Sequence, residues 1–258
     1  MSTLYIVATP IGNLRDITIR ALEILKEVDL ILSEDTRVTR KLLEHYEIKT
    51  PTLSYHQHSK LKKLNYIIKL LKEGKNLALV SDAGTPGISD PGGKLIAAIT
   101  KFTGVAELRS SPASLRSAVE PIQVKIVAVP GPSAVTAAAS ISGFSMDKFL
   151  FLGFPPTKRK RKKFFEKIIS SEYPVIFYES SYRIIKTLKE LKQIFQVSLK
   201  ENKFSTGQAS FKLQVVACRE LTKKFETIYR GNIEEVLREI KTNKIKGEFV
   251  VIVKNPQK

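Results

Sequence analysis

Residues 77–93 read LALVSDAGTPGISDPGG and change abruptly from apolar to Gly- and Pro-rich after Val80. A short apolar run with this punctuation predicts a buried strand that delivers a loop at its carboxyl end. Ligands of open α/β sheets bind at that edge of the sheet. Glycines in such a loop permit positive φ angles and a close approach of backbone to ligand. The stretch therefore predicts a ligand loop, with an ordinary surface loop as the alternative.

Short apolar runs alternate with amphipathic helical patterns through the first 143 residues. Between the runs, hydrophobic residues recur at three- and four-residue spacing, which is typical of helices. Strands that alternate with helices predict right-handed βαβ units and a parallel sheet. The expected strands lie at residues 4–8, 30–32, 52–55, 77–80 and 125–129.

Each of these runs ends in a distinctive polar loop. ATPIGN follows the first run, SEDTR the second, YHQH the third and PGPSA the last. Because the carboxyl ends of parallel strands share one edge of a sheet, the loops are expected to gather beside SDAGTP. Within SEDTR, Glu34 and Asp35 are expected to point to opposite sides, so that one can serve chemistry while the other caps the next helix.

The stretch SGFS at residues 142–145 marks the expected boundary between two domains, residues 1–143 and 148–258. The second domain also alternates apolar runs with helical patterns. The predicted fold class is therefore two α/β domains. The first has a mainly parallel sheet, the second has a mixed sheet, and a cofactor cleft lies between them.

The positive charge is concentrated in the second domain. The chain carries 43 Lys and Arg against 25 Asp and Glu, a net charge of +18. Residues 1–147 hold 18 cations and 14 anions, a net of +4, and residues 148–258 hold 25 and 11, a net of +14. This asymmetry favours a polyanion partner, most often nucleic acid. A generally Lys-rich composition explains the total better than it explains the imbalance.

Six consecutive cations at residues 158–163 precede an amphipathic helical pattern. Such a run is a candidate contact to a phosphate backbone, and a solvated helix face is the alternative. The residues are Lys158, Arg159, Lys160, Arg161, Lys162 and Lys163.

The composition excludes several functional classes. The single cysteine, Cys218, excludes an intrachain disulfide and a Cys-based metal cluster, which favours a cytoplasmic protein. No apolar run approaches the roughly 20 residues of a membrane helix, and the N-terminus lacks the pattern of a signal peptide. Walker, G-x-G-x-x-G and G-x-S-x-G motifs are also absent. His56 and His58 are a weak metal candidate, and we expect no metal.

Eight motifs in order give the chain a resemblance to one enzyme family. They are ATPIGNLRDI (8–17), EDTR (34–37), LVSDAGTPGISDPG (79–92), VPGPSA (129–134), GFPP (153–156), FYES (177–180), RELTKKFE (219–226) and KGE (246–248). Together they resemble the small-subunit ribosomal RNA 2′-O-methyltransferases of the tetrapyrrole-methylase superfamily, which act on a cytidine of the decoding region. The resemblance implies S-adenosylmethionine as cofactor, 16S ribosomal RNA or the small subunit as partner, and a homodimer.

The resemblance also implies which residues form the site. The cofactor-lining positions would be Pro10, Asp82, Gly84, Thr85, Pro86, Ile88, Gly131, Ser133, Ala134, Tyr178 and Arg219. On the substrate side, Glu34, Asp35, Arg37 and Glu179 are the catalytic hypotheses. Because a 2′-hydroxyl is a poor nucleophile, a carboxylate that accepts its proton is needed, and Asp35 is the first candidate. Lys223 joins the six-cation run as an expected RNA contact.

Departures from the family pattern leave two alternative functions open. The usual H-x-H-N-E reads His56-Gln57-His58-Ser59-Lys60 here, and Tyr182 stands where a His is usual. Extra residues lie near 102–123 and 198–210. A tetrapyrrole (precorrin-type) methyltransferase is the first alternative, although a small macrocycle does not call for so basic a domain. A non-catalytic RNA-binding protein is the second.

Overall fold

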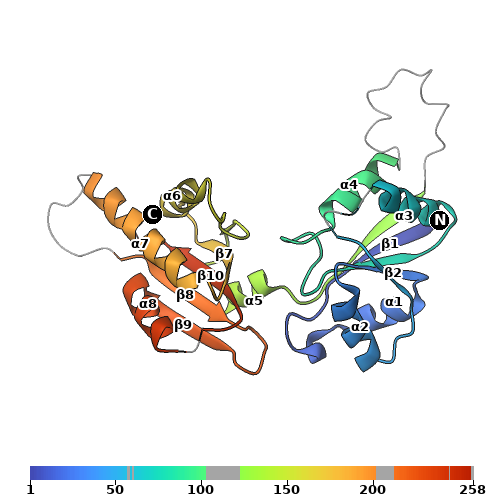
Figure 1. The fold of residues 1–258 in the computed structure, drawn as a ribbon, viewed down its shortest axis with the longest axis horizontal. Coiled ribbons are helices and arrows are strands. Elements are labelled where there is room, and N and C mark those ends of the chain that lie inside the picture. Colours follow the sequence, from blue (N-terminus) through green and yellow to red (C-terminus); the bar gives the residue numbers. More distant parts are fainter. Residues whose placement is uncertain (57–58, 60, 103–122, 202–211, 244, 257–258) are drawn as a thin grey trace, which may run out of the picture. The chain divides into compact units, whose positions relative to one another are not determined.

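The computed structural model describes residues 1–56, 59, 61–102, 123–201, 212–243 and 245–256, which form two compact units, Met1–Ser133 and Ala134–Lys258 (Figure 1). The domains expected from the sequence, 1–143 and 148–258, differ from these units in the placement of helix α5 (Ala134–Ser140). This helix packs against strand β10 (Glu248–Lys254) of the second unit.

The sheet of the first unit is five-stranded and parallel throughout, as the alternation of strands and helices predicts. Its strands follow the order β3-β2-β4-β1-β5. They are β1 (Ser2–Val7), β2 (Leu30–Ser33), β3 (Thr52–Ser54), β4 (Leu77–Val80) and β5 (Val124–Val129). Since β4, β1 and β5 are neighbours, the loops that follow them start side by side.

Helices cover both faces of this sheet, which explains the uninterrupted apolar run at β4. Ala78 and Val80 pack with α1 (Ile19–Glu27) and α2 (Thr36–His45) on one face. Leu77 and Leu79 pack with α3 (Leu61–Lys72) and α4 (Gly93–Phe102) on the other. A short 3-10 helix, η1 (Leu14–Asp16), precedes α1.

The second unit contains a five-stranded mixed sheet, also as predicted, in the order β6-β7-β10-β8-β9. Strands β6 and β7 are parallel, and the other pairs are antiparallel. The strands are β6 (Leu150–Phe151), β7 (Val175–Ser180), β8 (Gln214–Arg219), β9 (Thr227–Asn232) and β10.

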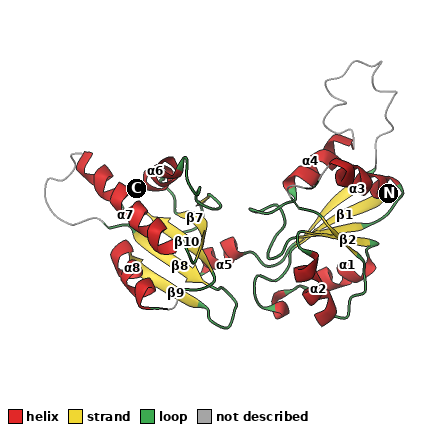
Figure 2. Cartoon of the chain, in the orientation of Figure 1, coloured by secondary structure: helices red, strands yellow, loops and turns green. Residues whose placement is uncertain are grey.

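Three helices of the second unit share one core cluster with its sheet (Figure 2). They are α6 (Arg161–Ser170), α7 (Ile184–Glu201) and α8 (Ile233–Thr242). Of the extra residues near 198–210, those up to Glu201 belong to α7 and the rest lie outside the described residues, as does most of the extra segment near 102–123. None of the described helices is long and apolar enough to cross a membrane.

Candidate functional site

Three loops of the first unit are tied together at the carboxyl edge of its sheet. The backbone N–H of Thr9 donates to the Gly84 carbonyl at 2.9 Å, and the N–H of Gly84 donates to the Thr9 carbonyl at 3.0 Å. The Thr85 hydroxyl donates to the Pro132 carbonyl at 3.3 Å. The loops after β1, β4 and β5 therefore form one Gly- and Pro-rich surface, as their motifs predict.

Glycine is required where these loops meet. Gly84 has a φ of +83°, and a Cβ there would lie 3.4 Å from Ile11 Cγ2 and 3.7 Å from the Pro132 carbonyl oxygen. A Cβ on Gly131 would lie only 3.0 Å from the Ala8 Cβ. Neither glycine contributes a side chain of its own to the junction, which permits close approach of the backbone to a ligand.

The expected cofactor residues fall in both units. Pro10, Asp82, Gly84, Thr85, Pro86, Ile88, Gly131 and Ser133 belong to the first unit, and Ala134, Tyr178 and Arg219 belong to the second. The Tyr178 ring meets the Phe151 ring edge to face and the Phe154 ring at a tilt, with centroid distances of 5.1 and 5.3 Å. The Arg219 Nε donates to the Lys246 carbonyl at 3.0 Å, so this nitrogen is already occupied.

Asp35 serves the local structure of the loop after β2. It is the N-cap of α2, and its Oδ1 accepts from the Arg37 N–H at 2.9 Å. Its Oδ2 pairs with Arg37 Nη2 at 2.6 Å. These hydrogen bonds from Arg37 lower the pKa of Asp35 to about 2. A carboxylate held so firmly in its charged form is a weak proton acceptor at neutral pH.

The pKa of Glu34 is raised, whereas that of Asp35 is lowered. Burial raises its pKa to about 6, and the negative charges of Asp82, Asp90 and Asp35 act in the same direction. Asp82 Oδ1 accepts from the Asp35 N–H at 2.9 Å, which ties the loops after β2 and β4 together. Burial also raises the pKa of Asp82. Of the two adjacent carboxylates, Glu34 is the one poised to exchange a proton near neutral pH.

Glu179 is enclosed by hydrogen-bond donors of its own unit. Its carboxylate accepts from Arg183 Nε at 2.7 Å, from the Thr187 hydroxyl at 2.5 Å and from the Ser180 N–H at 2.8 Å, and its side chain has no exposed surface. Glu179, which the sequence predicts to be catalytic, therefore stabilises the connection between β7 and α7 through these hydrogen bonds. Neither partner follows from sequence spacing, because Glu179 lies on β7, Arg183 in the turn before α7 and Thr187 on α7.

The same network reaches the loop that carries the basic run. Arg183 Nη1 donates to the Pro155 carbonyl at 3.2 Å, and Arg161 Nη1 donates to the Pro156 carbonyl at 2.9 Å. Arg161 Nη2 donates to the Thr187 hydroxyl at 2.6 Å. The motifs GFPP and FYES are therefore held against each other by two arginines.

Arg161 differs from its neighbours in the six-cation run. Its side chain is only 10% exposed and pairs with Glu190 Oε2 at 2.5 Å, so it is not available for an RNA contact. Lys162 lies 3.7 Å from Glu166. Lys223 also has partners, Glu220 at 2.9 Å and Glu248 at 3.4 Å. Within the six-cation run, the exposed residues without a carboxylate partner among the described residues are Lys158, Arg159, Lys160 and Lys163.

The histidine pair is only half described, because His58 lies outside the described residues. Within the described ranges, no three His, Cys, Asp or Glu side chains group closely enough to hold a metal ion.

Comparison with known proteins connects this geometry to a family. The model of the tetrapyrrole (corrin/porphyrin) methylases matches residues 3–237. Three relatives carry the name ribosomal RNA small subunit methyltransferase I. The one from Thermotoga maritima is 40% identical, covering 98% of both chains. The one from Mycoplasmopsis pulmonis is 41% identical, covering 98% of this chain and 97% of its own. The one from Haemophilus influenzae is 42% identical, covering 99% and 79%.

Solved structures share the fold at lower identity. The methyltransferase CobJ has a TM-score of 0.61 at 17% identity, covering 99% of this chain and 94% of its own. A cobalt precorrin-4 methyltransferase has a TM-score of 0.58 at 17% identity, covering 97% and 94%. These likenesses agree with the two α/β units described above.

Proposed function

The chain belongs to the tetrapyrrole methylases and, among them, to the ribosomal RNA small subunit methyltransferase I family, and on that premise we propose that it methylates the 2′-hydroxyl of a cytidine ribose in the decoding region of 16S ribosomal RNA. The observation that carries the proposal is the match of about 40% identity along almost the whole chain to relatives of that name. The enzyme is a methyltransferase that uses S-adenosylmethionine.

The residues at the edge of the first sheet fit this cofactor. Its adenosine and amino acid groups need backbone donors and acceptors at close range, and Gly84 and Gly131 add no side chain of their own to the junction. The sulfur of S-adenosylmethionine carries a positive charge, and the carboxylates of Glu34 and Asp82 complement such a charge. When bound, S-adenosylmethionine supplies a methyl group activated by the positive sulfur. Gly84, Thr85 and Gly131 would hold it.

We propose that a carboxylate oxygen of Glu34 accepts the proton of the ribose 2′-hydroxyl. A base is most effective when its pKa lies near the working pH, and Glu34 meets that condition better than Asp35. Asp35 instead holds the first turn of α2 and orients the exposed Arg37. Glu179 is a positioning residue of the second unit.

The second unit would supply the contacts to RNA. Its net charge, the exposed cations of the basic run and the names of the relatives all support this role. We propose further that the protein acts in the cytoplasm and as a homodimer. Light scattering tests the dimer, since the expected mass is twice the 29.0 kDa of one chain.

A methyl-transfer assay tests the proposed function. Purified protein is incubated with cofactor labelled in the methyl group and with bare 16S ribosomal RNA, assembled small subunits or a tetrapyrrole mixture. Label in the RNA at a cytidine 2′-oxygen is expected. Label in the tetrapyrrole alone would favour that alternative. Cofactor binding without transfer to any of the three would contradict the proposal, and absence of cofactor binding would favour a non-catalytic RNA-binding protein.

Gly84→Ala should weaken cofactor binding. The added Cβ enters the junction with Ile11 and Pro132, and the positive φ strains any L side chain. We expect the Kd for S-adenosylmethionine, measured by calorimetry, to rise roughly tenfold. Gly74→Ala is the matched control, because Gly74 has a φ of +84° in the same unit with nothing within 4 Å of its Cβ position. Equal losses of cofactor affinity in the two variants would refute a cofactor role for Gly84.

Arg159→Ala combined with Lys160→Ala should weaken RNA binding in a salt-dependent manner. Each lost phosphate contact lowers the slope of log K against log salt by about 0.7 to 0.9. We therefore expect a shallower slope and no change in cofactor Kd. Lys26→Ala with Lys72→Ala removes the same charge from the exposed surface of the first unit and serves as the control. An identical slope for the two double variants would mean that the basic run acts only through net charge.

A further inference from the structure

Tyr182 is the most exposed large hydrophobic side chain among the described residues. It lies in the turn between β7 and α7, and 97% of its surface is accessible. An aromatic ring in this position contributes nothing to the core of its own unit. Fully accessible rings on basic surfaces are the platforms on which unpaired bases stack.

A stripe of polar and basic side chains continues from Tyr182 along α7. Tyr182 and the side chains of this stripe, together with Ile185 and Glu190, line a surface hollow of about 440 Å³. Steps of three and four residues place the stripe on one face of the helix. Its members after Tyr182 are Lys186, Lys189 and Gln193.

The charge of this stripe is only partly balanced. Lys189 has no carboxylate partner among the described residues, and Lys186 lies 3.8 Å from Glu190. Glu190 is already paired with Arg161. The stripe therefore keeps a positive charge that can be neutralised by phosphate groups.

Arg161 also connects the stripe with the basic run. Its guanidinium reaches Glu190 and Thr187, both on α7, from the first residue of α6. The basic run is therefore held at Arg161 to Glu190, one of the residues that line the hollow. We call the set Tyr182, Lys186, Lys189 and Gln193 the α7 stripe.

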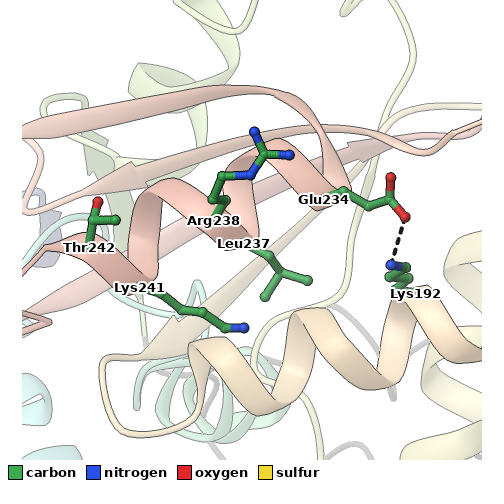
Figure 3. A pocket seen from close by; sticks show the side chains of 6 residues that line it. All are labelled: Lys192, Glu234, Leu237, Arg238, Lys241 and Thr242. Atoms are coloured by element: carbon green, nitrogen blue, oxygen red, sulfur yellow. Dashed lines mark ion pairs between the residues drawn. The ribbon is translucent and has the colours of Figure 1, made fainter.

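A second hollow, between α7 and α8, is also lined by basic side chains but lacks an aromatic ring. Lys192, Arg238 and Lys241 line it together with Leu237 and Thr242, and Glu234 pairs with Lys192 at 2.6 Å (Figure 3). Glu234 also pairs with Lys212 at 2.9 Å. The lining has three cations against one glutamate, so the hollow is basic without offering a ring on which a base can stack. This surface is suited to serve as a control.

We propose that the α7 stripe binds an unpaired segment of the RNA substrate, with one base stacked on Tyr182 and adjacent phosphates on Lys186 and Lys189. The inference rests on the proposed function and adds a contact outside the methylated nucleotide. Only unpaired RNA can offer the face of a base, because paired bases are stacked within the duplex. The Gln193 amide can donate to and accept from a base edge.

Tyr182→Trp creates a direct probe of this contact. The chain contains no tryptophan, so the variant has a single indole fluorophore. Single-stranded RNA carrying the decoding-region sequence should quench its emission, and the quenching should weaken with salt. The same sequence annealed to its complement should quench much less.

Tyr173→Trp is the matched control in the same unit. Tyr173 precedes β7 and Tyr182 follows it, so the six-residue strand separates them by about 20 Å. Tyr173 is also partly exposed and lies near Lys148. Equal quenching of both variants, or none at position 182, would overturn the proposal.

Affinity and turnover separate this inference from the proposed function. Tyr182→Ala and the pair Lys186→Ala with Lys189→Ala should each raise the RNA Kd roughly tenfold. Arg238→Ala with Lys241→Ala should change it less than twofold. Wild-type methyl transfer with an unchanged RNA Kd in the stripe variants would overturn the inference alone. Stripe-dependent RNA binding without any methyl transfer would overturn the proposed function alone.

Discussion

Glu34→Gln should abolish most methyl transfer while leaving cofactor binding intact. A positioned general base contributes about 10²- to 10⁴-fold to rate, so we expect kcat/KM to fall at least 100-fold. The amide keeps the size of the side chain but cannot accept the hydroxyl proton. Transfer of labelled methyl groups to small-subunit RNA measures the loss of activity. Calorimetry with S-adenosylmethionine shows whether cofactor binding is preserved.

The pH dependence follows from the same residue. In the wild type the base is active only when ionised, so kcat/KM should fall about tenfold per pH unit below a pH of about 6. The variant should lose this dependence.

The stability of the folded protein should depend on pH in the opposite sense to its activity, because the folded-state pKa of Glu34 is raised above its ordinary value of 4.5. The favourable contribution of protonated Glu34 is present at low pH and is lost as pH rises through about 6. Glu34→Gln should therefore raise Tm more at pH 8 than at pH 4.

Asp35→Asn decides between the two neighbouring carboxylates. Asn caps helices as well as Asp does, so the substitution removes the charge and keeps the cap. We expect the variant to retain methyl transfer within a few-fold, with its Tm lowered by loss of the ion pair to Arg37. If Asp35→Asn were inactive and Glu34→Gln active, the base would be Asp35 after all.

The parallel sheet and its ligand edge were predictable because local patterns reflect them. The four apolar residues of β4 are buried on both faces, and strand-end loops of a parallel sheet must meet. The choice of base was not predictable. Glu34 and Asp35 are adjacent in sequence. The nearby Arg37 lowers the pKa of Asp35, but the pKa of Glu34 is raised by burial and by the charges of Asp82 and Asp90, which the fold brings from another loop.

Helical spacing does not distinguish Arg161 from its neighbours in the basic run. Arg161 lies four and seven residues before the buried Phe165 and Ile168, but Lys162 lies three and seven residues before the buried Phe165 and Ile169, and its side chain is 80% exposed. Only the structure shows that the Arg161 guanidinium lies 5.0 Å from the Phe165 ring. Its partners Glu190 and Thr187 depend on how α6 packs on α7, which no local pattern specifies.

Glu179→Ala should cause the largest loss of stability. The carboxylate is buried and accepts from Arg183, Thr187 and the Ser180 N–H, so its removal leaves Arg183 without its charge partner and Thr187 without its acceptor. Breaking a buried ion pair typically costs about 3–5 kcal/mol, and we expect the free energy of unfolding to fall by about 3 kcal/mol. Urea unfolding followed by circular dichroism measures it. Lys186→Ala, whose Glu190 contact is 3.8 Å and exposed, is the control and should change stability by less than about 0.5 kcal/mol.

A double-mutant cycle distinguishes a positioning role of Glu179 from a catalytic one. Thr187 donates to Glu179 and accepts from Arg161, so Glu179→Gln and Thr187→Val should be non-additive in stability by about 0.5–3 kcal/mol. In the folded Glu179→Gln protein, kcat should stay within about threefold of the wild-type value while KM for RNA rises, because the loop at Pro155 and Pro156 loses its support. If kcat instead fell by about two orders of magnitude while stability stayed unchanged, Glu179 would belong among the groups that contact the reacting atoms.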